Sequence, residues 1–215
     1  MIYYILWVLN YIIVKLAFNP IIIGKENIPK KNGAVIAADH SDQSDPIFIS
    51  SATKRRLYYL ANYDILYPKK DKPFYHRFAF LARWTKQVPI IKNQGRSQEA
   101  IDKAVNLVKR GKLFVIFPEG TIDGGETIIK PRRGVARIAL KARAPIIPIG
   151  IINTAGTLPK GKIFFQKYPK VKINIGKPLY YRKYYGKHND KKITKLIAND
   201  VMRHIKKLCE EAEKL

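Results

Sequence analysis

Five short apolar runs recur along this chain, and helical patterns separate most of them. Apolar runs of this length favour buried strands over helices. The runs lie at Ala34–Ala38, Leu57–Ala61, Val88–Ile91, Lys112–Phe117 and Ile146–Ile151, and one or two more strands are expected within residues 162–176. Strands that alternate with helices usually pair in parallel. The pattern therefore predicts a single α/β domain with a mostly parallel sheet flanked by helices.

The predicted helices begin and end at residues that favour helix termini. Ser97 can cap a helix that runs through Arg110, and Gly111 follows its end. Further helices are expected from Gly134 to Arg143 and from about Asp190 onward. Apolar residues at helical spacing should face the core, and these are Ala100, Ile101, Ala104, Val105 and Val108 on the first helix and Ile193, Leu196, Ile197, Val201, Ile205, Leu208 and Ala212 on the last.

Residues 1–23 form an apolar segment in which only Lys15 is charged. As a helix, Ile2 to Val14 would extend about 20 Å, less than the roughly 30 Å of bilayer hydrocarbon. The segment contains Tyr3, Tyr4, Trp7 and Tyr11, residue types that favour the headgroup region, and Pro20 ends any helix there. We expect one or two membrane-docking helices over 1–23, followed by a globular domain over 24–215. The alternatives are a buried core helix and a tilted full span.

The chain is strongly basic, with 41 Lys and Arg against 16 Asp and Glu, a net charge of +25. Such a charge attracts nucleic acid, anionic lipid or an acidic carrier protein alike. Cys209 is the only cysteine, which excludes an intramolecular disulfide and a Cys-rich metal site. The four histidines are scattered, so the sequence implies no metal and no bound cofactor.

A histidine and an aspartate follow the first predicted strand. Ala34–Ala38 runs into a polar segment that contains His40 and Asp45. Histidine is the usual base for deprotonating an alcohol, and a carboxylate on its second nitrogen stabilises the imidazolium that forms. The two residues can meet across a turn at a helix start. The alternative is that Asp45 merely caps a helix whose first residue is Pro46.

A second polar segment follows the strand Lys112–Phe117. Glu119, Gly120 and Thr121 lie there, where a polar acceptor could bind. Downstream, Arg132 and Arg133 precede a predicted helix start, and both arginines and helix N-termini bind phosphate well. The alternative is a turn in which Glu119 packs against one of these arginines.

These segments resemble the boxes of a known enzyme family. His40 to Asp45 matches the His-x4-Asp box, and Phe117–Thr121 matches the Phe-Pro-Glu-Gly-Thr box, of the PlsC-like glycerolipid acyltransferases. Two further boxes agree, Val88–Ile91 and Ala144–Ile149. Over roughly residues 20–180 the chain most closely resembles the 1-acyl-sn-glycerol-3-phosphate acyltransferases. An acyltransferase domain is thus expected over 24–215.

The resemblance implies a role for each matching residue. His40 would be the catalytic base, oriented by Asp45, and the acceptor would contact Glu119, Gly120 and Thr121. The resemblance also implies an N-terminal membrane-docking element, in agreement with the interpretation of residues 1–23.

The chain departs from the family pattern at four positions. Asp39 stands where Asn is usual and Asp42 where Ser is usual, so negative charge lies close to His40. Lys92 and Ile122 both replace a common arginine. We expect Lys92 and Arg132 to hold the acceptor phosphate instead.

The expected reaction moves a fatty acyl group from acyl-CoA or acyl carrier protein to the sn-2 hydroxyl of 1-acyl-sn-glycerol 3-phosphate. The product is phosphatidate, and transfer is direct, without an acyl-enzyme. We expect a monotopic or peripheral protein on the cytoplasmic face of the cell membrane, held partly by anionic lipid. The alternatives are another acceptor (glycerol 3-phosphate or a lysophospholipid), an inactive relative that only binds lipid, and a nucleic-acid binder that uses residues 168–187. Nucleic acid is not expected as a partner, since it explains neither the boxes nor the N-terminus.

Overall fold

The computed structural model describes residues 2–67, 79, 83, 85–90, 97–120, 131–157 and 170–215. Within these residues the chain forms a seven-stranded sheet of order β1-β7-β6-β2-β5-β3-β4. The strands are β1 (Ile21–Ile23), β2 (Ala34–Ala38), β3 (Leu57–Asn62), β4 (Val88–Ile90), β5 (Leu113–Ile116), β6 (Ile146–Ile152) and β7 (Lys172–Ile175). All neighbours pair in parallel except β6 and β7. The predicted α/β domain with a mostly parallel sheet is confirmed.

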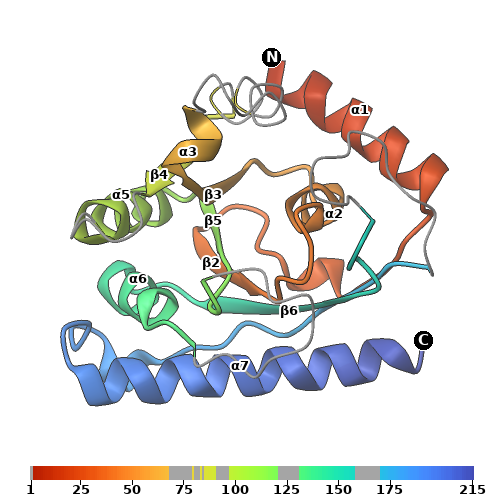
Figure 1. Ribbon diagram of the computed structural model, residues 1–215. Helices are drawn as coiled ribbons and strands as arrows, with labels where there is room; N and C mark the ends of the chain where they lie inside the picture. The colour runs from red at the N-terminus through yellow and green to blue at the C-terminus, as the bar shows by residue number, and fades with distance from the viewer. Residues whose placement is uncertain are drawn as a thin grey trace.

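Helices cover both faces of the sheet (Figure 1). The described helices are α1 (Ile2–Ala17), α2 (Asp45–Ser51), α3 (Tyr63–Leu66), α5 (Ser97–Lys109), α6 (Gly134–Ala142) and α7 (Lys191–Glu213), with 3-10 turns η1 (Lys25–Asn27) and η2 (Arg182–Tyr184). Helices α5, α6 and α7 pack on one face, while α1 and α2 lie on the other.

The central strand β2 shows why an unbroken apolar run predicts this arrangement. Its five residues are fully buried. Val35 and Ala37 belong to the core beneath α5, α6 and α7, whereas Ala34, Ile36 and Ala38 belong to the core on the opposite face. A strand buried on both faces has no polar side, so alternation is absent from its sequence.

The predicted helices are present and end as their sequences suggest. All five core residues expected on α5 are buried, and Gly111 follows the helix with φ of +75°. Asp190 caps α7 by accepting the backbone N–H groups of Lys192 and Ile193. Leu196 was expected to face the core but is exposed. At about 100° per residue it lies opposite Ile205, which is buried.

Helix α1 turns Trp7 and Asn10 inward and most of its aliphatic side chains outward. Trp7 Nε1 donates to the Ser50 carbonyl oxygen (3.0 Å), and Asn10 Nδ2 donates to the Ile47 carbonyl oxygen (3.1 Å), both on α2. The outward side chains are exposed, namely Tyr4, Ile5, Val8, Leu9, Ile12, Ile13 and Leu16. This polarity is the reverse of that of a helix on a water-exposed surface.

The segment 1–23 contains one helix and one strand. Ile21–Ile23 lies at the sheet edge and pairs in parallel with β7. Among the described helices, none combines the length and apolar character needed to cross a bilayer. Of the strands expected within residues 162–176, β7 is present, and the first apolar stretch there lies outside the described residues.

Candidate active site

The site lies where two adjacent parallel strands end. Strands β2 and β5 pair along their length. His40 follows the end of β2 by two residues, and Phe117 follows β5 directly. Because the carboxyl ends of parallel strands lie at one edge of the sheet, both boxes are brought together there.

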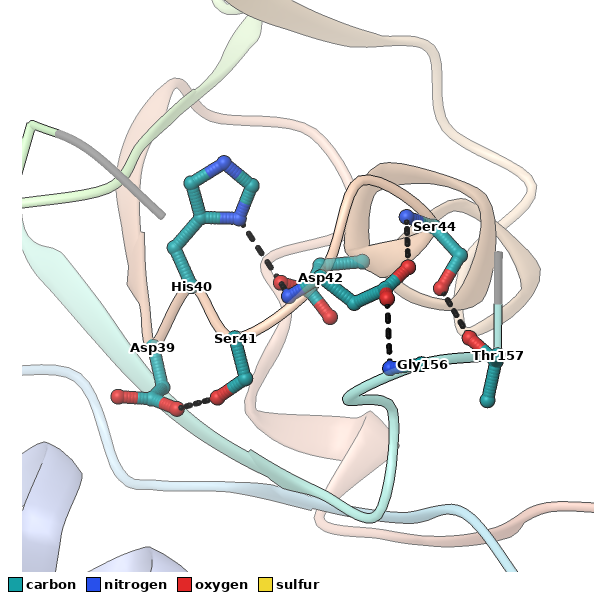
Figure 2. Close-up of polar contacts among 8 residues, drawn as sticks. Asp39, His40, Ser41, Asp42, Ser44, Gly156 and Thr157 are labelled. Carbon is teal, nitrogen blue, oxygen red and sulfur yellow. Dashed lines mark hydrogen bonds and ion pairs between the residues drawn. The ribbon is translucent and has the colours of Figure 1, made fainter. Parts of the chain in front are cut away.

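His40 and Asp45 form a hydrogen-bonded pair. His40 Nδ1 lies 2.8 Å from Asp45 Oδ2, and the Asp45 side chain is fully buried. Burial raises the pKa of the Asp45 carboxyl, and the hydrogen bond from His40 opposes that rise. When Asp45 is ionised, Nδ1 carries a proton and Nε2 is the free acceptor. Since Nδ1 is occupied by Asp45, Nε2, on the other side of the His40 ring (Figure 2), can receive a proton from a substrate.

Asp45 does not act as a helix cap. It is the first residue of α2, and Ser44 occupies the cap position without a capping hydrogen bond from its side chain. The Asp45 carboxylate accepts from His40 and from the Asp42 backbone N–H (2.9 Å). The five-residue spacing thus places the pair across the turn that precedes the helix, as the sequence predicted.

The His40 imidazole also stacks on an aromatic ring. The ring centroids of His40 and Phe117 are 3.9 Å apart, with 14° between the planes. Tyr59 stacks farther from Phe117, at 6.4 Å and 21°. Phe117 opens the Phe-Pro-Glu-Gly-Thr box, so the two boxes meet through this contact as well as through the sheet.

Arg132 folds back over the second box. Its backbone N–H donates to the Pro118 carbonyl oxygen (2.7 Å), and its side chain lies over Gly120, where any Cβ would overlap Arg132 Nε and Cδ. Gly120 has φ of +73°, a left-handed conformation that glycine adopts without strain. Arg132 is exposed to solvent.

The remaining expected site residues are placed less fully. Glu119 is buried. Lys92 and Thr121 lie outside the described residues.

A comparison with known protein families supports the same interpretation of the two boxes. A family model for acyltransferases matches residues 19–152, more than half of the chain. This chain belongs to the acyltransferase family. The matched region contains both boxes and the sheet strands β1 to β6.

Individual relatives of this acyltransferase point the same way. The 1-acyl-sn-glycerol-3-phosphate acyltransferase of Bacillus subtilis is 28% identical over 74% of this chain and 73% of the relative. The Borreliella burgdorferi enzyme of the same name is 30% identical over 67% of this chain and 55% of its own length. The crystal structure of the 1-acyl-sn-glycerophosphate acyltransferase of Thermotoga maritima superposes with a TM-score of 0.68 at 24% identity, covering 94% of this chain and 79% of that one. The last likeness shows the shared fold.

Two features of the acyltransferase site were not predicted from the sequence. The first is the stacking of His40 on Phe117. The second is the contact of the His-x4-Asp box with residues 154–157, the turn that follows β6. The Asp42 carboxylate accepts from the Gly156 backbone N–H in this turn (2.9 Å). The sequence did contain a signal for the second feature, because the polar residues Asn153 and Thr154 follow β6 directly, at a strand end where sites are often built.

Proposed function

We propose that this acyltransferase moves a fatty acyl group from an acyl thioester, acyl-CoA or acyl carrier protein, to the sn-2 hydroxyl of 1-acyl-sn-glycerol 3-phosphate, which gives phosphatidate. The observation that carries the proposal is the 2.8 Å His40–Asp45 pair, whose imidazole stacks on Phe117 of the box that Arg132 folds over. The names of the Bacillus and Borreliella relatives support this acceptor.

The proposed reaction is a direct transfer. His40 Nε2 takes the proton of the acceptor hydroxyl as its oxygen attacks the thioester carbonyl carbon. Asp45 stabilises the imidazolium that results. The tetrahedral intermediate collapses by breaking the C–S bond, and the leaving thiolate takes the proton back from the imidazolium. Base and acid are thus the same residue, and the enzyme returns to its starting protonation state.

A covalent intermediate on Cys209 is not part of the proposal. Burial raises the pKa of the Cys209 thiol to about 12. A thiol is nucleophilic only as the thiolate, so Cys209 stays protonated and unreactive at neutral pH.

Arg132 is the proposed ligand of the acceptor phosphate. Arg132 is an exposed residue, and its side chain lies over Gly120, in the box that follows β5. Arginine can bind a phosphate through two parallel hydrogen bonds. In this proposal the phosphate fixes the glycerol backbone so that its free hydroxyl faces His40. Lys92 is kept as a second expected phosphate ligand on sequence grounds.

Helix α1 is the proposed membrane contact. Its sixteen residues extend about 24 Å, and its exposed side is mostly aliphatic, with Tyr4 near one end and Lys15 near the other. A helix of this kind lies in the plane of the interface with its apolar side among the acyl chains. The net charge of +25 adds attraction to anionic headgroups. We therefore propose a monotopic or peripheral protein on the cytoplasmic face of the cell membrane.

An acyl-transfer assay with the full-length protein in mixed micelles tests the function. Lysophosphatidate, glycerol 3-phosphate and lysophosphatidylcholine serve as acceptors, each with oleoyl-CoA and with oleoyl-acyl carrier protein. We expect phosphatidate from lysophosphatidate, and a folded His40→Ala protein should be inactive. A preference for glycerol 3-phosphate or lysophosphatidylcholine would overturn the acceptor assignment. Normal turnover by His40→Ala would overturn the mechanism.

A further inference from the structure

The turn after β6 packs directly against the box that holds the catalytic pair. Strand β6 is the neighbour of β2, so residues 153–157 leave the sheet beside residues 39–45. The turn is closed by the Thr157 backbone N–H, which donates to the Thr154 carbonyl oxygen (2.9 Å). Asn153 and Gly156 both have positive φ, at 65° and 78°.

Asp42 connects this turn to the box. One carboxylate oxygen accepts from the Gly156 backbone N–H (2.9 Å), and the other accepts from the Ser44 backbone N–H (2.8 Å). Ser44 Oγ lies 2.6 Å from Thr157 Oγ1, and both side chains are fully buried. Figure 2 shows these contacts as a bridge between the two segments. The Asp42 carboxylate thus accepts from one backbone N–H group of the turn and from one of its own box.

The same bridge reaches Asp45. The Asp42 backbone N–H donates to Asp45 Oδ2 (2.9 Å), the oxygen that also accepts from His40 Nδ1. Asp45 Oδ2 therefore accepts from two donors, His40 Nδ1 and the Asp42 backbone N–H. The contacts of Asp42 with the turn hold the second donor in place.

The other carboxylate oxygen of Asp45 has a candidate donor in the turn. Asp45 Oδ1 and Thr154 Oγ1 are both buried, and within the described part of the chain neither makes a hydrogen bond of regular geometry. The Thr154 hydroxyl acts on the Asp45 carboxyl closely enough to lower its pKa against the effect of burial. A buried donor or acceptor without a partner destabilises the fold, and a hydrogen bond between the two removes that cost in free energy.

We propose that the turn 154–157 positions the catalytic pair, with Thr154 as the donor to Asp45 Oδ1 and Asp42 as the link that holds the turn in place. The inference rests on the proposed function, because the pair must carry charge during acyl transfer. Asp45 has to remain anionic while His40 becomes an imidazolium. A hydroxyl on Oδ1 stabilises that anion in a site that water does not reach.

Thr154→Val tests the donor, because valine keeps the shape and removes the hydroxyl. We expect kcat to fall about 10- to 100-fold with KM for lysophosphatidate unchanged. Loss of the donor raises the pKa of Asp45, so the acid limb of the kcat profile should move to higher pH. Thr154→Ser should restore both kcat and the profile. If Thr154→Val does not fold, Thr154→Ala provides the same measurements.

Asp42→Asn tests the link against Asp39→Asn as a matched control. An Asn side chain has one acceptor oxygen, so it cannot accept from both Gly156 and Ser44. The Asp39 carboxylate accepts from the Ser41 hydroxyl (2.9 Å) and makes no described contact with the turn. We expect a lower kcat for Asp42→Asn and near-normal turnover for Asp39→Asn. Equal behaviour of the two variants would overturn the role of Asp42.

A titration of the Asp45 carboxyl by 13C NMR, in wild type and in Thr154→Val, separates this inference from the proposed function. A higher Asp45 pKa in the variant supports the positioning role even if no acceptor is acylated, in which case only the proposed function fails. An unchanged titration together with unchanged kcat would overturn the inference. A Thr154→Val protein that is fully active and more stable would do the same, since its hydroxyl would then have been unbonded.

Discussion

The imidazole of His40 lies flat on the ring of Phe117, with centroids 3.9 Å apart. The contact joins the two sequence boxes of the family at the reacting residue. The stacking opposes rotation of the His40 imidazole about its Cβ–Cγ bond. Nδ1 therefore remains hydrogen-bonded to Asp45, and Nε2 remains directed away from it. A cation held over an aromatic face is also stabilised by the ring quadrupole. Phe117 therefore favours the imidazolium that forms during transfer.

Phe117→Leu should expose this contribution. Leucine keeps an apolar side chain but removes the aromatic face. A contact worth about 0.5–2 kcal/mol corresponds to a fall in kcat of roughly 2- to 30-fold, and the acid limb of the kcat/KM profile should move to lower pH. Phe117→Trp keeps an aromatic face, so the acid limb of its kcat/KM profile should lie closer to that of wild type. An unaltered profile in Phe117→Leu would show that the ring serves packing alone.

Asp45→Asn should lower activity without lowering stability. Burial raises the pKa of Asp45 above its value in the unfolded chain. Its contribution to stability is therefore greatest below the unfolded pKa and is lost as the pH rises through the folded pKa. At pH 7 the buried carboxylate destabilises the fold, so the Asn variant should melt at the same temperature as wild type or higher. The difference should shrink at pH 4.

The activity of the same variant should fall about 10²-fold or more, by analogy with other His–carboxylate pairs. Thermal melts at the two pH values and kcat from the micelle assay provide the comparison. A marked loss of melting temperature with near-normal kcat would instead assign Asp45 a structural role.

The sheet was predictable because its strands carry their own signal. The apolar runs at β2, β5 and β6 are buried almost throughout, so burial on both faces appears directly in the sequence. Strand β1 was not predicted, since Ile21–Ile23 is only three residues long within a longer apolar segment. Its partner is β7, about 150 residues away, and nothing local marks that pairing.

The same distinction holds for the candidate site. His40 and Asp45 are five residues apart and belong to one turn, so their pairing could be inferred from spacing and residue type. The contacts of Asp42 with Gly156 and of Ser44 with Thr157 join residues more than 100 positions apart. These contacts form because β6 lies beside β2 in the sheet, and the order of strands in a sheet cannot be read from local sequence. The sequence shows that Asp42 carries a negative charge, but it does not show which backbone N–H groups its carboxylate accepts from.

Charged substitutions on the outer side of α1 should weaken membrane binding. Leu9 and Ile13 are about half exposed there, and each apolar side chain that enters a bilayer contributes up to about 1.5–3 kcal/mol. Leu9→Glu with Ile13→Glu should reduce sedimentation with anionic vesicles at least tenfold. Deleting α1 is a less specific test, because Phe18 just after it packs on the buried Phe48 ring (centroids 5.0 Å apart).

Leu196→Glu is the control for the single variant Leu9→Glu, since each adds one negative charge at an exposed leucine. Leu196 is an equally exposed leucine, but it lies on α7. Its substitution should leave vesicle binding unchanged in both anionic and zwitterionic lipid. If the two sets of variants lose binding to the same extent, net charge rather than the α1 surface controls the association.

Arg132→Ala should raise KM for lysophosphatidate far more than it lowers kcat. A phosphate far from the reacting bond is held alike in the ground and transition states, so its loss appears in KM. One charge-assisted contact of about 1.5–3 kcal/mol corresponds to roughly 10- to 150-fold. Arg133→Ala is the control, because Arg133 occupies the cap position of α6 and does not lie over Gly120. Identical KM values for the two variants would remove Arg132 from the phosphate site.

Gly120→Ala provides an independent test of the same placement. An alanine Cβ would occupy the space of Arg132 Nε and Cδ, and the flexible arginine would move rather than the backbone. Gly120→Ala should therefore raise KM much as Arg132→Ala does, with an added loss of stability of about 1–2 kcal/mol from the positive φ. In an Arg132→Ala background the Gly120 substitution has no arginine to displace, so its effect on KM should largely vanish while the loss of stability remains. Fully additive effects on KM in the double variant would mean that Gly120 contacts the acceptor by itself.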